Sequence, residues 1–219
     1  MSSGPGEETA QFRESLRNVT PLRLHEPLAA ALGALVDGDI VEFELTDVVK
    51  AAGHACPSVT GAYLAVREAL ARLYGDETPV RGGIGVVVYG EPDEGAYGVM
   101  SQVMGMITGA APDTGFKGLG PLYRRQGLLE FSREKPDPEA ACFLFFRLDT
   151  GRSALVRFQP WNIPFSPEKA ARLAQLMEKV LAGTAEVAER HEFGELWQAK
   201  VTGMLAGDRM EDWLTVEEA

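Results

Sequence analysis

Cysteine and histidine are scarce in this sequence. Its 219 residues include two cysteines and three histidines, too few for a disulfide framework or a self-contained four-cysteine zinc finger. We therefore expect Cys56 and Cys142 to be free thiols or single metal ligands. The sequence also lacks the run of roughly 20 apolar residues that a membrane-spanning helix requires. Met1 to Gln11 contains no apolar core of a signal peptide, so we expect a cytoplasmic protein without a membrane partner.

Basic residues are fewer than acidic ones. Lysine and arginine total 21 against 32 aspartates and glutamates, which gives a formal net charge of −11. Such a charge repels phosphate backbones over most of a surface, so we expect no nucleic acid partner. Hydrophobic residues make up 45% of the chain and charged residues 24%, a balance typical of a globular protein with a substantial buried core.

The spacing of apolar residues predicts an α+β fold, with a mixed or antiparallel sheet packed against helices. Helices are predicted at residues 12–19, 27–37, 47–52, 57–74, 96–107, 167–182 and 185–205. Strands are predicted at residues 40–45, 84–89, 128–131, 142–148 and 154–158, the last two forming a hairpin around the turn at 149–151. We expect a disordered tail at 1–10, one core domain at 11–183 and a helical C-terminal extension at 184–219.

His54 and Cys56 are two strong metal-ligand types placed two residues apart. Pro57 suits the first position of a helix, which places the pair in the turn before it. The helix dipole favours negative charge there and hence the thiolate that metal coordination and nucleophilic attack require. A zinc site needs four ligands, or three and a water. The remaining ligands would come from His25, His191, Asp93, Glu94 or a second copy of the chain.

A simpler interpretation of the same pair involves no ligand. Free cysteine is among the most buried residue types and behaves as a small hydrophobic side chain. In that case Cys56 packs in the core, and His54 is a hydrogen-bonded residue of the loop.

The residues around this pair resemble a known family. Val48 to Pro57 is similar to the Gly-His-x-Cys-Pro signature of the FmdE-like family of formylmethanofuran dehydrogenase components. Glu94-Gly95, then 107–110 and 115–118, resemble the family's acidic turn, Thr-Gly and Gly-Lys-Gly stretches, so that the likeness spans Asp47 to Gly120. It implies an α+β core, a homodimer, and a metal-binding or active-site-like cavity that contains His54 and Cys56.

The sequence departs from the family pattern in two places. Residues 93–109 lack the family's second cysteine, and no cysteine follows Cys142, so the C-terminal zinc finger of many members is missing. A site with fewer thiolates is less specific for zinc. The resemblance therefore implies a site without fixing its metal or its reaction.

Basic side chains also gather around a glycine-rich stretch. The stretch Gly115 to Gly120 contains Lys117 and is followed four and five residues later by Arg124 and Arg125, in an otherwise acidic chain. The stretch does not match the phosphate-binding pattern Gly-x-x-x-x-Gly-Lys-Ser/Thr. It predicts a pocket for a small anionic ligand, with Glu94 as a further contact, and a solvated loop is the alternative.

Three functional hypotheses follow. In the first, His54 and Cys56, with His25 as a third ligand, hold zinc or another first-row transition metal in a metal-binding protein or metalloenzyme. In the second, the chain is a non-catalytic sensor or carrier of haem or another cofactor, with His54, Cys56 or His25 as axial ligand. In the third, Cys56 carries out metal-free thiol catalysis with His54 as base.

Overall fold

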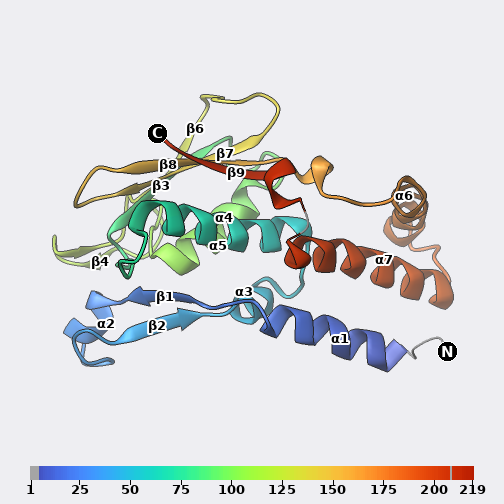
Figure 1. The fold of residues 1–219 in the computed structure, drawn as a ribbon, viewed down its shortest axis with the longest axis horizontal. Coiled ribbons are helices and arrows are strands. Elements are labelled where there is room, and N and C mark those ends of the chain that lie inside the picture. Colours follow the sequence, from blue (N-terminus) through green and yellow to red (C-terminus); the bar gives the residue numbers. More distant parts are fainter. Residues whose placement is uncertain (1–4, 208) are drawn as a thin grey trace.

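A five-stranded mixed sheet forms one layer of the computed structural model, which describes residues 5–207 and 209–219 (Figure 1). In spatial order its strands are β6 (Leu129–Ser132), β3 (Ile84–Tyr89), β7 (Ala141–Arg147), β8 (Ser153–Phe158) and β9 (Leu214–Glu218). β3 pairs with β6 in parallel, and the other pairs are antiparallel. Together with the helices described below, this sheet confirms the predicted α+β class.

Two helices, α4 (Pro57–Tyr74) and α5 (Tyr97–Thr108), cover one face of the sheet (Figure 1). Pro57 occupies the first turn of α4, and Gly75 follows its last residue with a positive φ of 57°, as the sequence predicted. α4 lies between the sheet and a second layer, so most of its residues are buried. Gly61 lets α4 approach β8 closely, because a Cβ there would lie 2.6 Å from Cζ of Phe158.

The second layer is formed by β1 (Leu22–His25), α2 (Pro27–Ala31), β2 (Ile40–Phe43) and α3 (Leu45–Ala52), with β1 and β2 antiparallel. The hydroxyl of Tyr63 in α4 donates to the carbonyl oxygens of Phe43 (2.9 Å) and Thr20 (3.2 Å). Burial raises the pKa of Tyr63 to about 12. This buried phenol therefore ties the second layer to the central helix.

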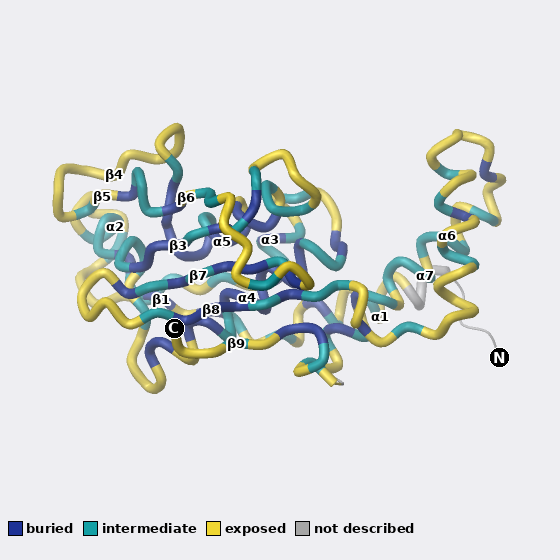
Figure 2. The backbone as a smooth tube through the Cα atoms, turned by 90° about the horizontal axis from the view of Figure 1, so that it is seen from above, coloured by how far each residue is buried: buried dark blue, intermediate teal, exposed yellow. Residues whose placement is uncertain are grey.

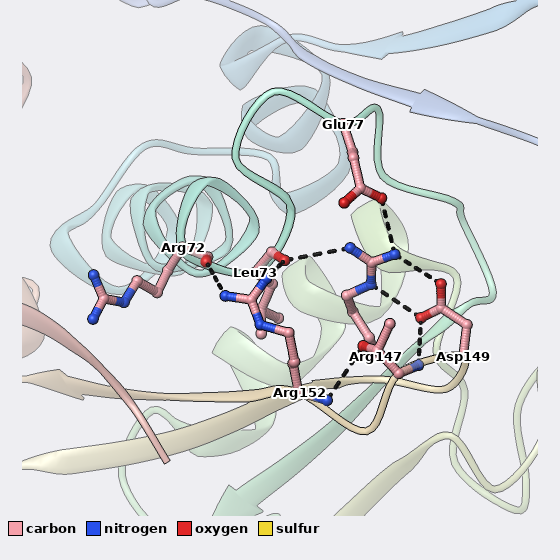
Figure 3. Close-up of polar contacts among 7 residues, drawn as sticks. Arg72, Leu73, Glu77, Arg147, Asp149 and Arg152 are labelled. Carbon is pink, nitrogen blue, oxygen red and sulfur yellow. Dashed lines mark hydrogen bonds and ion pairs between the residues drawn. The ribbon is translucent and has the colours of Figure 1, made fainter.

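The β7–β8 hairpin is joined to the end of α4 by two arginines (Figure 3). Arg147 is buried and donates to the Leu73 carbonyl (3.4 Å), to Glu77 (3.1 Å) and to Asp149 (2.7 Å). Arg152 donates to the same carbonyl of Leu73 at 3.2 Å. The hydrogen bonds from Arg147 lower the pKa of Asp149 to about 2. The predicted hairpin is thus confirmed, and its turn carries the carboxylate that pairs with Arg147.

The chain ends differ from the expected boundaries. Residues 1–4 of the expected tail lie outside the described residues, whereas residues 5–10 belong to α1 (Pro5–Arg17). At the other end, α6 (Pro167–Leu181) and α7 (Val187–Ala206) pack together and extend beyond one end of the sheet (Figure 2). The chain then returns through a short 3₁₀ turn (Met210–Asp212) to β9. The stretch from 184 to 219 is therefore not wholly helical, because its last residues pair with β8.

Between α5 and β6 the chain forms a short antiparallel hairpin of two strands, β4 (Gly118–Leu119) and β5 (Tyr123–Arg124). Within the described part of the chain, none of the helices combines the length and apolar character needed to cross a membrane.

Candidate ligand pocket

The segment from Gly53 to Cys56 forms the turn between α3 and α4, and Pro57 begins α4, as predicted. Cys56 is the N-cap of α4 and is buried, and its Sγ accepts a hydrogen bond from the amide of Val59 at 3.4 Å. His54 is exposed, with Nδ1 3.0 Å from the carbonyl oxygen of Ala52. Both contacts are local, and among the described residues no hydrogen bond joins the thiol to the imidazole.

The third predicted metal ligand lies on another element. His25 ends β1, and its Nδ1 lies 3.4 Å from the carbonyl oxygen of Asp39. In the described ranges, no group of three or more His, Cys, Asp and Glu side chains is arranged to hold a metal ion. The structure therefore does not gather His54, Cys56 and His25 into one cluster, and the metal, haem and thiol hypotheses stay predictions.

Helix α7 is attached to the same turn. Trp197 Nε1 donates to the carbonyl oxygen of Ala55 at 3.1 Å, although 142 residues separate the two. The indole of Trp197 also packs against the ring of Phe193, with centroids 5.6 Å apart. Trp197 therefore forms a contact between α7 and the turn before α4, and Phe193 packs against it.

A buried ion cluster that the sequence did not predict lies at the start of α2. The carboxylate of Glu26 accepts the amide of Leu28 at 3.1 Å and pairs with both Arg81 and Arg125. Glu26 is 7% exposed and Arg125 is 4% exposed. Because one carboxylate faces two guanidinium groups, the cluster carries a surplus of one positive charge.

The two arginines differ in how fully they are bonded. Arg81 is held by the carbonyl oxygens of Ile107 (3.1 Å) and Met106 (2.9 Å) in addition to Glu26. Arg125 reaches Glu26 through Nη2, but its Nη1 is buried and has no hydrogen-bond partner among the described residues. Burial lowers the pKa of Arg125, and neighbouring Arg81 lowers it further, whereas Glu26 raises it. An unpaired buried donor costs about 1–3 kcal/mol, so Arg125 has unused capacity for an anion.

Two glycines make room for Arg125. A Cβ at Gly109 would lie 1.6 Å from Nη1 of Arg125, and a Cβ at Gly82 would lie 2.7 Å from its Nε. Both glycines also have positive φ angles, 76° and 84°, which other residues rarely adopt. The side chain of Arg125 thus packs directly against the backbone at Gly82 and Gly109, in space that a side chain at either position would occupy.

The arginine pair lines a pocket of about 720 Å³ beside α5. This volume is in the usual range for small-molecule sites, which are mostly apolar with a few polar groups. The apolar part of the lining comes from α2, α5, β6 and the glycine-rich segment, and includes Leu28, Met106, Ala110, Pro112, Leu129 and Phe131. No histidine, cysteine or carboxylate stands among the described residues that line it.

The predicted anion-binding residues divide between pocket and surface. Lys117 lines the pocket and is exposed. Arg124 is exposed outside the lining, and its Nε donates to the carbonyl oxygen of Gln126 at 2.7 Å. Glu94 lies 3.4 Å from Lys135 in the turn before α5 and is likewise outside the lining. The glycine-rich stretch was a useful signal, because it indicated Lys117, Arg124 and Arg125 together, and of these three Arg125 is the buried group.

Comparison with known proteins adds no family. No protein-family model matches the chain, and no curated protein matches it either. Membership of the FmdE-like family therefore stays a prediction from the residues quoted above.

Proposed function

We propose that this chain binds a small organic anion in the pocket lined by Arg81 and Arg125. The observation that carries the proposal is Arg125, a buried guanidinium at the pocket wall whose Nη1 lacks a partner among the described residues. Hydrogen bonds between a guanidinium and an anion are about twice as strong as neutral ones. A small shift of the guanidinium that exposes Nη1 to the pocket would let an anionic ligand satisfy a group that the protein alone leaves unpaired.

The surrounding residues favour binding over catalysis. The pocket lining offers no imidazole, thiol or carboxylate in the described part of the chain to act as general base or nucleophile. It therefore fits the sensor or carrier class that the sequence raised for a cofactor. The axial ligands suggested there for haem, His25, His54 and Cys56, are not part of this pocket.

Binding of an amphipathic anion provides a direct test. Anilinonaphthalene sulfonate fluoresces when bound in an apolar site and carries one negative charge, so it serves as the probe in a fluorescence titration. Arg125→Met should weaken its binding by roughly 10- to 100-fold, the equivalent of a charge-assisted hydrogen bond of about 1.5–3 kcal/mol. Arg124→Met is the matched control, because this neighbouring arginine is exposed outside the pocket, and binding should be unchanged.

Folding of each variant is checked by far-ultraviolet circular dichroism, and Arg81→Met is a second variant of the pair. Equal affinity of the wild type and Arg125→Met for the probe would refute the proposal, whatever the result for Arg81→Met. So would the absence of saturable binding to the wild type.

A transition-metal site at His54 and Cys56 is a second candidate. It is supported by the position of Cys56 at the N-terminus of α4, where backbone amides favour a thiolate. Since the described residues supply no cluster of three ligands, this proposal requires a ligand from a second copy of the chain, consistent with the homodimer that the family resemblance implies.

Metal content and mass test this candidate together. Elemental analysis of protein purified without an affinity tag should find zinc or another first-row metal in the wild type and in Cys142→Ala, but not in Cys56→Ala. Light scattering should show a dimer. A stable monomeric wild type without metal would contradict it.

A further inference from the structure

We infer that the ligand of this pocket is an organic monocarboxylate that enters head first, with its carboxylate at Arg125 and its apolar body beneath Phe116 and Leu119. The inference rests on the proposed function and adds to it the chemical class and the orientation of the ligand. Three separate observations support it: the net charge of the buried ion cluster, the scarcity of free polar groups in the pocket lining, and the exposure of the individual lining residues.

The charge of the buried cluster matches one negative charge. Arg81 and Arg125 contribute two positive charges and Glu26 removes one. Lys117 also lines the pocket, but it is exposed, so water and salt screen its charge. The cluster would also attract a group with two negative charges, but such a group would lose much more hydration on burial than a single charge, and one surplus positive charge could not neutralise it. The planar guanidinium also matches the two oxygens of a carboxylate.

The rest of the lining offers few groups to a polar ligand. Ser101 is buried, and its hydroxyl already donates to the carbonyl oxygen of Gly98 at 2.8 Å. Gln102 and Lys117 are exposed. The hydroxyl groups of a sugar or the edge of a base would remain without partners against the apolar walls, and each unpaired buried group is costly. An alkyl or aromatic body, in contrast, gains from every apolar contact.

Exposure increases from the charged group to the apolar rim. Arg125 is 4% exposed, whereas Leu119 is 52% exposed and Phe116 is 87% exposed. Both apolar residues line the same pocket, so the charge is deep and the mouth is hydrophobic. A ligand whose anionic head reaches Arg125 must therefore place its apolar body at Phe116 and Leu119, where it covers exposed hydrophobic surface.

Displacement of bound anilinonaphthalene sulfonate by a series of single compounds tests the inference. Hexanoate, octanoate and octyl phosphate are used below the concentrations at which they form micelles, and 1-octanol is used below its solubility limit. Octanoate should displace the probe at least tenfold more effectively than 1-octanol, and also more effectively than octyl phosphate, which carries close to two charges at neutral pH. Each added CH₂ should raise the affinity about fourfold, so octanoate should bind about fifteenfold more tightly than hexanoate.

Two exposed residues of the same segment test the orientation. Phe116→Ser should reduce the difference between octanoate and hexanoate, because the serine no longer covers the alkyl chain. Leu122→Ser is the matched control, since Leu122 is 89% exposed but does not line the pocket. Neither side chain supports the core, so both variants should fold.

The outcomes separate this inference from the proposed function. Stronger displacement by octyl phosphate would overturn the carboxylate assignment and leave an anion pocket. Unchanged chain-length dependence in Phe116→Ser would overturn the orientation. Equal displacement by 1-octanol and octanoate would show that charge does not matter and would overturn both, as would full binding of the probe to Arg125→Met.

Discussion

Replacing Glu26 by glutamine should destabilise the folded protein strongly. Its carboxylate is the single negative charge between Arg81 and Arg125, and Arg125 is nearly inaccessible to solvent. Removing one partner of a buried ion pair costs about 3–5 kcal/mol, because the charge left behind remains desolvated. Glutamine keeps a carbonyl oxygen that can still accept one hydrogen bond, so we expect a value in the lower part of this range.

Urea unfolding followed by circular dichroism measures this loss, with Glu42→Gln as the matched control. Glu42 lies 3.2 Å from Arg23, but both side chains are more than half exposed, and an exposed pair contributes only about 0–1 kcal/mol. In a thermal melt Glu26→Gln should lower Tm by roughly 6–16 °C, which corresponds to a loss of about 3–4 kcal/mol at about 2–4 °C per kcal/mol for a chain of this size. If the two variants unfold at the same urea concentration, the argument that the cluster holds an uncompensated charge is refuted.

Four further predictions concern packing and pH. Gly61→Ala should destabilise the protein by about 1–3 kcal/mol in urea melts, because a Cβ there would lie 2.6 Å from an aromatic ring of β8. Gly194→Ala, with nothing within 4 Å of the new methyl group, should stabilise α7 by about 0.5–1 kcal/mol. The pKa of Asp149, lowered to about 2 by Arg147, means that its contribution to stability is present above the unfolded pKa of about 3.9. The gap in unfolding free energy between the wild type and Asp149→Asn should therefore persist at pH 7 and shrink between pH 4 and pH 2, and a constant gap would contradict this. The pKa of Tyr63, raised to about 12 by burial, predicts a contribution that is complete below pH 10 and lost as the pH rises towards 12. Urea melts of Tyr63→Phe should show a smaller decline over that range than the wild type.

Local signals in the sequence were sufficient for the central elements. The β-branched run at 84–89 has the same bounds as β3, and Pro57 and Gly75 mark the ends of α4 as predicted. The hairpin at 142–158 was also predicted, because its strands are apolar and a short polar turn joins them.

Elements that depend on distant pairing were not predicted. β1 has four residues in which Leu22 and Leu24 alternate with Arg23 and His25, a run too short to identify a strand from the sequence. It is a strand because β2 pairs with it. β9 was placed in the helical extension, but its pairing with β8 determines its conformation. The helix predicted from Pro27 to about residue 37 ends at Ala31, since Leu32 and Val36 find no buried surface and remain exposed.

The candidate pocket illustrates the same limit. Lys117 was predicted from the composition of its segment, and it does line the pocket. Glu26, however, meets Arg81 across 55 residues and Arg125 across 99 residues. Neither spacing carries a local signature, so the sequence could indicate basic residues near a glycine-rich loop but not which of them is buried.

The glycines at 82 and 109 have an evolutionary consequence. Either position could accept a side chain only if the guanidinium of Arg125 moved away, since a methyl group at Gly109 would occupy nearly the same place as Nη1. A substitution at either glycine is therefore costly while Arg125 is retained. In diverging descendants of this chain, a side chain at position 82 or 109 should appear only where Arg125 has been replaced, whereas the glycines can persist without the arginine because of their positive φ angles.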